Sequence, residues 1–132
     1  LLVNLATEMS GETYARSIFT IHAATRQIEE FFTQYDLILS PTVLMPPPSL
    51  GFMDTSSTDF ETYSEHFGQF WGYTNLYNAT GNPAISLPLS WSSDNLPIGM
   101  QFVASMGNES LLFQISRQLE EAVPWFNKRP TL

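Results

Sequence analysis

Apolar residues recur every three or four positions from about Thr13 to Gln34. This spacing puts them on one side of an α-helix, which Ser10 or Thr13 can cap at its N-terminus. The apolar stripe comprises Ile18, Ile21, Thr25, Ile28 and Phe32. The short apolar run "YDLILSP", from Tyr35 to Pro41, follows and predicts a buried strand that stops at the proline.

A long loop separates this strand from the next helix. The loop "TVLMPPPSLGFMDTSS", residues 42–57, is rich in Pro, Gly and Ser and yet contains several large apolar side chains. Loops of this kind are functional or are covered by another element. Thr58 and Glu61 form a capping-box pair that opens a second helix, which Gly81 and Pro83 end. Its stripe is typical of a core-facing side and comprises Phe60, Tyr63, Phe67, Phe70, Trp71, Thr74 and Tyr77.

Strict alternation of side-chain character then predicts a β-hairpin, with strands at 84–91 and 98–103 around the polar turn "SSDN". Pro88 lies inside the first strand, and because it lacks an N–H it must occupy an edge, a bulge or a gap in pairing. Asn108 caps a third helix, which Pro124 ends. The order of elements predicts an α/β fold in which helices pack on part of a mixed β-sheet. Three strands are few for a free-standing sheet.

Composition excludes several classes of function. The net charge is −8 with a single lysine, so we expect no nucleic-acid partner. The chain has no cysteine, which rules out disulfides, zinc–thiolate sites and a cysteine nucleophile. No apolar run approaches the roughly 20 residues that cross a bilayer, so we expect no membrane partner and a cytoplasmic location. The sequence indicates no metal and no cofactor.

Motifs for catalysis are equally absent from the sequence. There is no Gly-x-Ser-x-Gly elbow, Ser-x-x-Lys, P-loop or dinucleotide fingerprint. His22 and His66 are far apart, and we interpret both as structural; Lys128 stands in a polar tail. The helix acids Glu29, Glu30, Glu120 and Glu121 are interpreted as solvated. We therefore assign no catalytic residue to this chain.

Four stretches together carry a family resemblance: "YDLILSPT", "TNLYNATGNPAISLPLSW", "DNLPIGMQFVA" and "NESLLFQISRQLE". In combination they resemble the C-terminal segment of the amidase signature family. The likeness runs from the first helix to about Glu121, and residues 1–132 would be the C-terminal part of one domain. "LPIGMQFV" and the terminal "PW" look most similar to family hydrolases of cyclic amides.

The resemblance implies one large α/β domain with a mixed sheet covered by helices. Family members hydrolyse amides with a Ser–Ser–Lys arrangement, in which a neutral lysine relays a proton and backbone N–H groups hold the oxyanion. Those residues belong to the N-terminal half of the family, and none matches a position here. The chain alone is thus expected to be inactive, and it opens on Leu-Leu as an excised fragment would.

What this half would contribute is a wall of the substrate pocket. The resemblance points to Val43, Leu44, Trp71 and Asn75 as substrate-binding residues. An apolar loop and an aromatic helix face could desolvate the methylenes of an amide substrate. The alternative is that these residues are simply core. Asn78 is expected to tie the helix end to the Gly81 turn instead.

Three functions stay open. The first is the C-terminal portion of an amidohydrolase that cleaves linear or cyclic amide C–N bonds in a small-molecule substrate. The second is a protein like the amidotransferase subunit that feeds ammonia to misacylated tRNA, and the acidic charge argues against this partner. The third is a non-catalytic module that binds an apolar ligand. Without the N-terminal half of the parent, we expect much exposed apolar surface, which a homodimer could cover.

Overall fold

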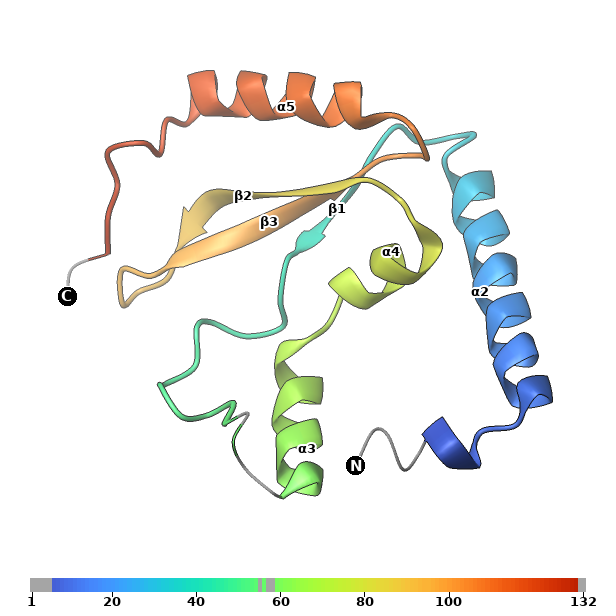
Figure 1. The fold of residues 1–132 in the computed structure, drawn as a ribbon. Helices are drawn as coiled ribbons and strands as arrows, with labels where there is room; N and C mark the ends of the chain where they lie inside the picture. Colours follow the sequence, from blue (N-terminus) through green and yellow to red (C-terminus); the bar gives the residue numbers. More distant parts are fainter. Residues whose placement is uncertain (1–5, 55, 57–58, 131–132) are drawn as a thin grey trace.

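The computed structural model describes residues 6–54, 56 and 59–130. Figure 1 shows a central sheet with helices on both sides. In chain order the elements are α2 (Gly11–Phe31), β1 (Ile38–Pro41), α3 (Phe60–Phe70), α4 (Thr74–Thr80), β2 (Ala84–Trp91), β3 (Pro97–Val103) and α5 (Glu109–Ala122). The α/β class and each expected strand are confirmed.

The three strands pair antiparallel in the order β1-β3-β2. The predicted hairpin is β2–β3, and its turn contains Asn95 with a left-handed φ of 59°. The register of β2 against β3 shifts between Leu87 and Ser90. Pro88 lies within this irregularity, where its missing N–H interrupts no ladder bond, as expected from the sequence.

One face of the sheet carries the apolar core. Alternation brings Leu39, Phe102 and Ile85 into one row on neighbouring strands. Helix α5 packs on this face, and Leu112 and Phe102 are buried there at 4% and 7% exposure. The helix faces the sheet with Leu112, and Ile115 and Leu119 pack beside it. This face is a conventional helix-on-sheet core.

We name the opposite face the polar face after its central row, and the fully buried Val103 also lies on it. Ser40, Gln101 and Ser86 form the corresponding row, directly across from one another. Helix α4 lies on this side of the sheet, away from α5 (Figure 1). Its residues Tyr77 and Thr80 are buried.

The predicted continuous second helix is wrong, because the chain breaks into α3 and α4 around Trp71. Trp71 is extended, with ψ at 116°. The carbonyl of Phe70 accepts a hydrogen bond of 3.1 Å from the backbone N–H of Leu44 in the long loop. A Cβ on Gly72 would overlap the side chain of Leu44. The loop thus inserts Leu44 at the helix break, and a larger residue at position 72 would have to displace that side chain.

The helix caps differ in detail from expectation. Ser10 caps α2 and accepts the N–H of Thr13 at 3.1 Å, as predicted. Thr58, the expected cap of the second helix, lies outside the described residues. Asp59 is the N-cap of α3, and it accepts the N–H and the hydroxyl of Thr62.

Asn108 is the N-cap of α5, but its side chain makes no capping bond, contrary to the prediction. Its backbone, with φ −102° and ψ 40°, lacks the extended conformation from which a cap side chain reaches the first turn. Gly81 ends α4 with φ at 82°, as expected for a left-handed C-terminal residue.

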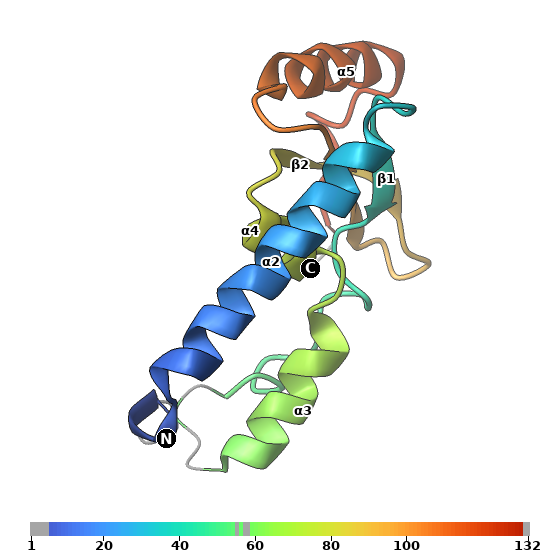
Figure 2. The ribbon, with the colours of Figure 1, turned by 90° about the vertical axis from the view of Figure 1, so that its right-hand side faces the viewer.

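Helix α2 stands beside the sheet (Figure 2). Its predicted stripe is the half-buried side, although no residue of the helix is fully buried. Glu29 is not a solvated acid as the sequence suggested. Its Oε1 accepts the side-chain N–H of Asn82 at 2.6 Å and the backbone N–H of Met106 at 3.2 Å. One carboxylate therefore ties α2 to the start of β2 and to the loop before α5.

Large apolar side chains remain exposed over the described part of the chain. Leu50 is fully exposed, and Phe19, Phe113 and Phe126 are each about 70% exposed. No described helix is both long and apolar enough to cross a bilayer. The apolar surface expected from the sequence is thus present.

Candidate functional site

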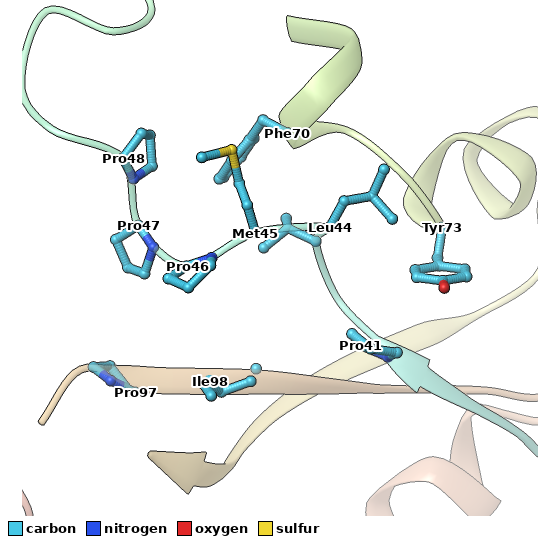
Figure 3. Close-up of a pocket in the computed structure, with 12 residues that line it drawn as sticks. Pro41, Leu44, Met45, Pro46, Pro47, Pro48, Phe70, Tyr73, Pro97 and Ile98 are labelled. Atoms are coloured by element: carbon cyan, nitrogen blue, oxygen red, sulfur yellow. The ribbon is translucent and has the colours of Figure 1, made fainter. Parts of the chain in front are cut away.

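Two cavities flank the break between α3 and α4. The first, of about 380 Å³, lies between the long loop and the hairpin end of the sheet. Figure 3 shows the loop with its three prolines running opposite the strand that carries Pro97 and Ile98, while the side chain of Met45 points away from this strand toward Phe70. The whole lining comprises Pro41, Val43, Leu44, Met45, Pro46, Pro47, Pro48, Phe70, Tyr73, Pro97, Ile98 and Gly99. We call this the apolar pocket.

Three prolines and two contacts to α3 fix the conformation of the long loop around this pocket. Prolines fix φ and favour extended chain, so Pro46–Pro48 cannot fold back as a helix. Leu44 is anchored at the helix break by its hydrogen bond to Phe70. Further along, Nδ1 of His66 lies 2.7 Å from the carbonyl of Phe52, and the two rings stack at 4.1 Å. The structural interpretation of His66 is thereby supported.

The second cavity, of about 460 Å³, lies between α4 and the polar face of the sheet. Most of its lining can donate or accept hydrogen bonds. The residues are Trp71, Thr74, Tyr77, Asn78, Asn82, Ala84, Ile85, Ser86 and Gln101. We call this the polar cavity.

Several polar atoms at this face have no hydrogen-bond partner among the described residues. Gln101 is 4% exposed, and its Nε2 is buried and unpaired. Oγ1 of Thr74 and Oγ of Ser40 are buried and unpaired in the same way. Each such group costs free energy when no partner satisfies it. The face therefore has hydrogen-bonding capacity that the described chain does not use.

No charged side chain from the described part of the chain lines either cavity. Burial raises the pKa of Tyr77, so its phenol stays neutral. The described residues also contain no cluster of His, Asp or Glu that could hold a metal ion. What these linings can do chemically is exclude water and form neutral hydrogen bonds.

The four predicted site residues do not gather in one place. Val43 and Leu44 line the apolar pocket, whereas Trp71 lines the polar cavity. Asn75 is exposed on α4 and lines neither cavity. Asn78, expected to support the helix end, also lines the polar cavity.

Sequence reasoning missed Gln101 and Thr74. Gln101 sits in an alternating strand between Gly99 and Val103, and a long polar side chain on the inward side of a strand was the available signal. Thr74 was counted within an aromatic stripe. Its role depends on the helix break, which the stripe did not reveal.

Comparison with known proteins identifies the family of this chain. The profile of the family described as Amidase matches residues 3–113. The chain is 38% identical over 110 residues to "Putative amidase AmiC" of Mycobacterium leprae, covering 83% of this chain and 23% of that protein. It is 36% identical to "6-aminohexanoate-cyclic-dimer hydrolase" of Paenarthrobacter ureafaciens, covering 99% and 28%. The chain thus spans about a quarter of the length of these relatives.

A solved structure of 6-aminohexanoate cyclic dimer hydrolase superposes with a TM-score of 0.86 at 36% identity, over 98% of this chain and 28% of that one. The A subunit of the glutamyl-tRNA(Gln) amidotransferase of Aliarcobacter butzleri is 36% identical over 77% of this chain and 21% of its own length. The family profile covers well over half of the chain, and the relatives bear it out. The chain therefore belongs to the amidase signature family.

Proposed function

We propose that this chain is the C-terminal part of an amidohydrolase domain that cleaves linear or cyclic amide C–N bonds. The reactive Ser–Ser–Lys residues would lie on the rest of the parent, and the chain alone would be inactive. Its contribution is part of the sheet and a wall of the substrate pocket. Val43, Leu44, Trp71 and Asn75 stay the proposed substrate-binding residues.

The observation that carries this proposal is the apolar pocket. Its loop keeps Leu44 about half exposed although the side chain is large and apolar. Such a concave, uncharged surface suits the methylenes of an aliphatic amide, which lose water when they bind. The relatives named above include a hydrolase of a cyclic amide dimer, which fits a substrate of this class.

The test is hydrolysis of simple aliphatic amides by the full-length parent. Replacing the lysine of its N-terminal half should abolish turnover, and an unchanged rate would refute the mechanism. Leu44→Ser should raise the KM for a long aliphatic amide by roughly tenfold, because a leucine that becomes buried when the substrate binds contributes about 1.5 kcal/mol. Leu50→Ser is the matched control, since Leu50 is fully exposed and outside the pocket.

A second candidate is an amidotransferase component, favoured by the likeness to the A subunit named above. The net charge of −8 argues against this function, because the chain has only five cationic side chains to neutralise the phosphates of a tRNA. Glutamine-dependent amidation of misacylated tRNA by the parent would establish this function. Ligand binding with no turnover of any amide would instead indicate a non-catalytic binding module.

The sequence-based expectations of a cytoplasmic location and of a homodimer stay proposals. A homodimer would bury part of the exposed apolar surface. Sedimentation of the purified chain at several concentrations tests it, and a monomer at all of them would refute it.

A further inference from the structure

The polar cavity is a half-open groove of about 460 Å³, which has room for a small polar group as well as for water. Its lining includes Trp71 and Tyr77 together with Asn78, Asn82 and Ser86. Most of these residues can donate or accept hydrogen bonds, so the lining suits a polar group that needs several partners.

Gln101 gives the cavity its specific chemistry. Its Nε2 has no partner in the described structure, although the residue is 4% exposed. The last torsion of a glutamine side chain is broad, so a rotation of the carboxamide presents its N–H groups to the cavity. Oγ1 of Thr74, also unpaired among the described residues, lies in the same lining. Both unpaired atoms are shielded from solvent, so each would have to turn toward the cavity to bond an occupant.

The occupant must be neutral. No charged residue of the described chain lines the cavity. The carboxylate of Glu29 bonds Asn82, which lines the cavity, and it also accepts the backbone N–H of Met106. A charged group would lose its hydration there without an opposite charge to compensate. An amide is neutral and both donates and accepts, which matches the glutamine and threonine groups.

The two cavities adjoin on the sheet. Gly99 lines the apolar pocket, and Ser86 lines the polar cavity. A Cβ on Gly99 would lie 2.7 Å from Oγ of Ser86 and 2.8 Å from Oγ1 of Thr42. Those two hydroxyls bond to each other at 2.5 Å across the glycine. The apolar and polar linings are thus neighbours, separated by one pair of hydroxyls.

We propose that the polar cavity is a subsite for a neutral amide group of the substrate, which Gln101 recognises through its carboxamide. This inference rests on the proposed amide hydrolysis. A substrate with two amides would place its methylenes against the apolar pocket and its second amide in the polar cavity. Gln101 is a specificity-determining residue in this scheme, not a catalytic one.

The experiment uses the full-length parent and three variants: Gln101→Met, Gln101→Glu and the control Gln114→Met. Gln101→Met keeps the side-chain length but removes both hydrogen-bonding groups. Gln114 is exposed on α5, on the other side of the sheet. The substrates are an aliphatic monoamide and a diamide whose second amide follows after about five methylenes, a spacing that lets the chain cross the apolar pocket.

We expect Gln101→Met to raise the KM for the diamide roughly 5- to 20-fold while changing the monoamide KM less than about twofold. Gln101→Glu should weaken the diamide further, because it adds a buried charge. The control should leave both KM values unchanged. Equal KM values for the diamide in wild type and Gln101→Met would overturn the proposal.

A different result would also overturn it. If Gln101→Met lowers the Tm of the parent but changes both substrates equally, the carboxamide bonds a peptide group of the parent's own chain. Binding of N,N′-dimethyladipamide, measured by calorimetry, needs no turnover and separates the two proposals. If the wild type cleaves neither substrate but binds this probe through Gln101, amide hydrolysis fails and the subsite stands.

Discussion

The two faces of the sheet are packed in different ways. On the α5 face, Leu112 and Phe102 are buried against each other's elements, and the surrounding side chains are apolar. On the α4 face, Gln101 and Ser40 keep buried polar atoms without partners among the described residues. The alternation of the strands gives the two faces different side chains, and different helices pack on them. The described chain forms a packed apolar core on the α5 face, whereas polar atoms on the α4 face still lack hydrogen-bond partners within it.

The contrast separates residues that hold the fold from residues that shape a site. A core side chain contributes through apolar area removed from water, whatever the rest of the parent does. The α4 face includes a broken helix, an inserted loop and unpaired donors, each of which costs stability in isolation. Such costs concentrate where function requires them.

The largest expected effect is on the α5 face. Leu112→Ala should lower the free energy of unfolding by about 2 to 5 kcal/mol, because it leaves a cavity under α5. Urea denaturation followed by circular dichroism measures it. The control Phe113→Ala removes a neighbouring side chain that is 68% exposed and should change stability by less than about 0.5 kcal/mol. Similar losses for both variants would mean that α5 is not docked on the sheet.

An intermediate effect is expected at the helix break. Gly72→Ala should lower the free energy of unfolding by about 1 kcal/mol, because the new methyl group displaces the side chain of Leu44, which is half-exposed and can shift. Leu44→Ala in the same chain should restore most of that loss, which a double-mutant cycle measures.

Gly68→Ala is the matched control for that cycle. Gly68 lies inside α3 with no described atom within 4 Å of its would-be Cβ, so alanine there should stabilise the helix by up to about 1 kcal/mol. A loss at Gly72 that persists without Leu44 would contradict the proposed insertion of the loop.

The smallest effect is expected at the start of α3. Hydrogen bonds from the hydroxyl and backbone of Thr62 hold the pKa of Asp59 below its ordinary value of 3.8. A lowered pKa in the folded state means that the carboxylate stabilises the helix above pH 3.8 and that this contribution is lost as pH falls through the folded value. The amide shift of Thr62 in an NMR titration from about pH 7 to about pH 2 should follow this loss.

Asp59→Asn keeps a capping oxygen but cannot titrate, so the shift of Thr62 in that variant should be flat over the same pH range. A titration that survives in Asp59→Asn would assign it to another acid, and the cap would not explain it.

Local signals were sufficient for much of the fold. The stripe of α2, the alternation of the hairpin and the left-handed Gly81 each depend on neighbouring residues, and the structure confirms them. Pro88 also predicted an interruption of strand pairing, because it has no N–H to donate, and the register of β2 shifts at this position.

The sequence pattern did not predict the contacts between distant segments. The break after Phe70 depends on Leu44, which approaches from the loop and has no local signal in the helix. In the sequence, Glu29 resembles any surface acid, because Asn82, which bonds its carboxylate in the structure, lies 53 positions away. The polar cavity exists only because strand register places Gln101 beneath α4, which periodicity alone does not show.

The carboxylate of Glu29 has a consequence for motion. Helix α2 has no fully buried residue, and this one side chain joins it both to Asn82 and to Met106. Breaking these two hydrogen bonds would loosen the helix from the sheet while the α5 core stays intact. We therefore expect the amide protons of α2 to exchange with solvent before those of β3.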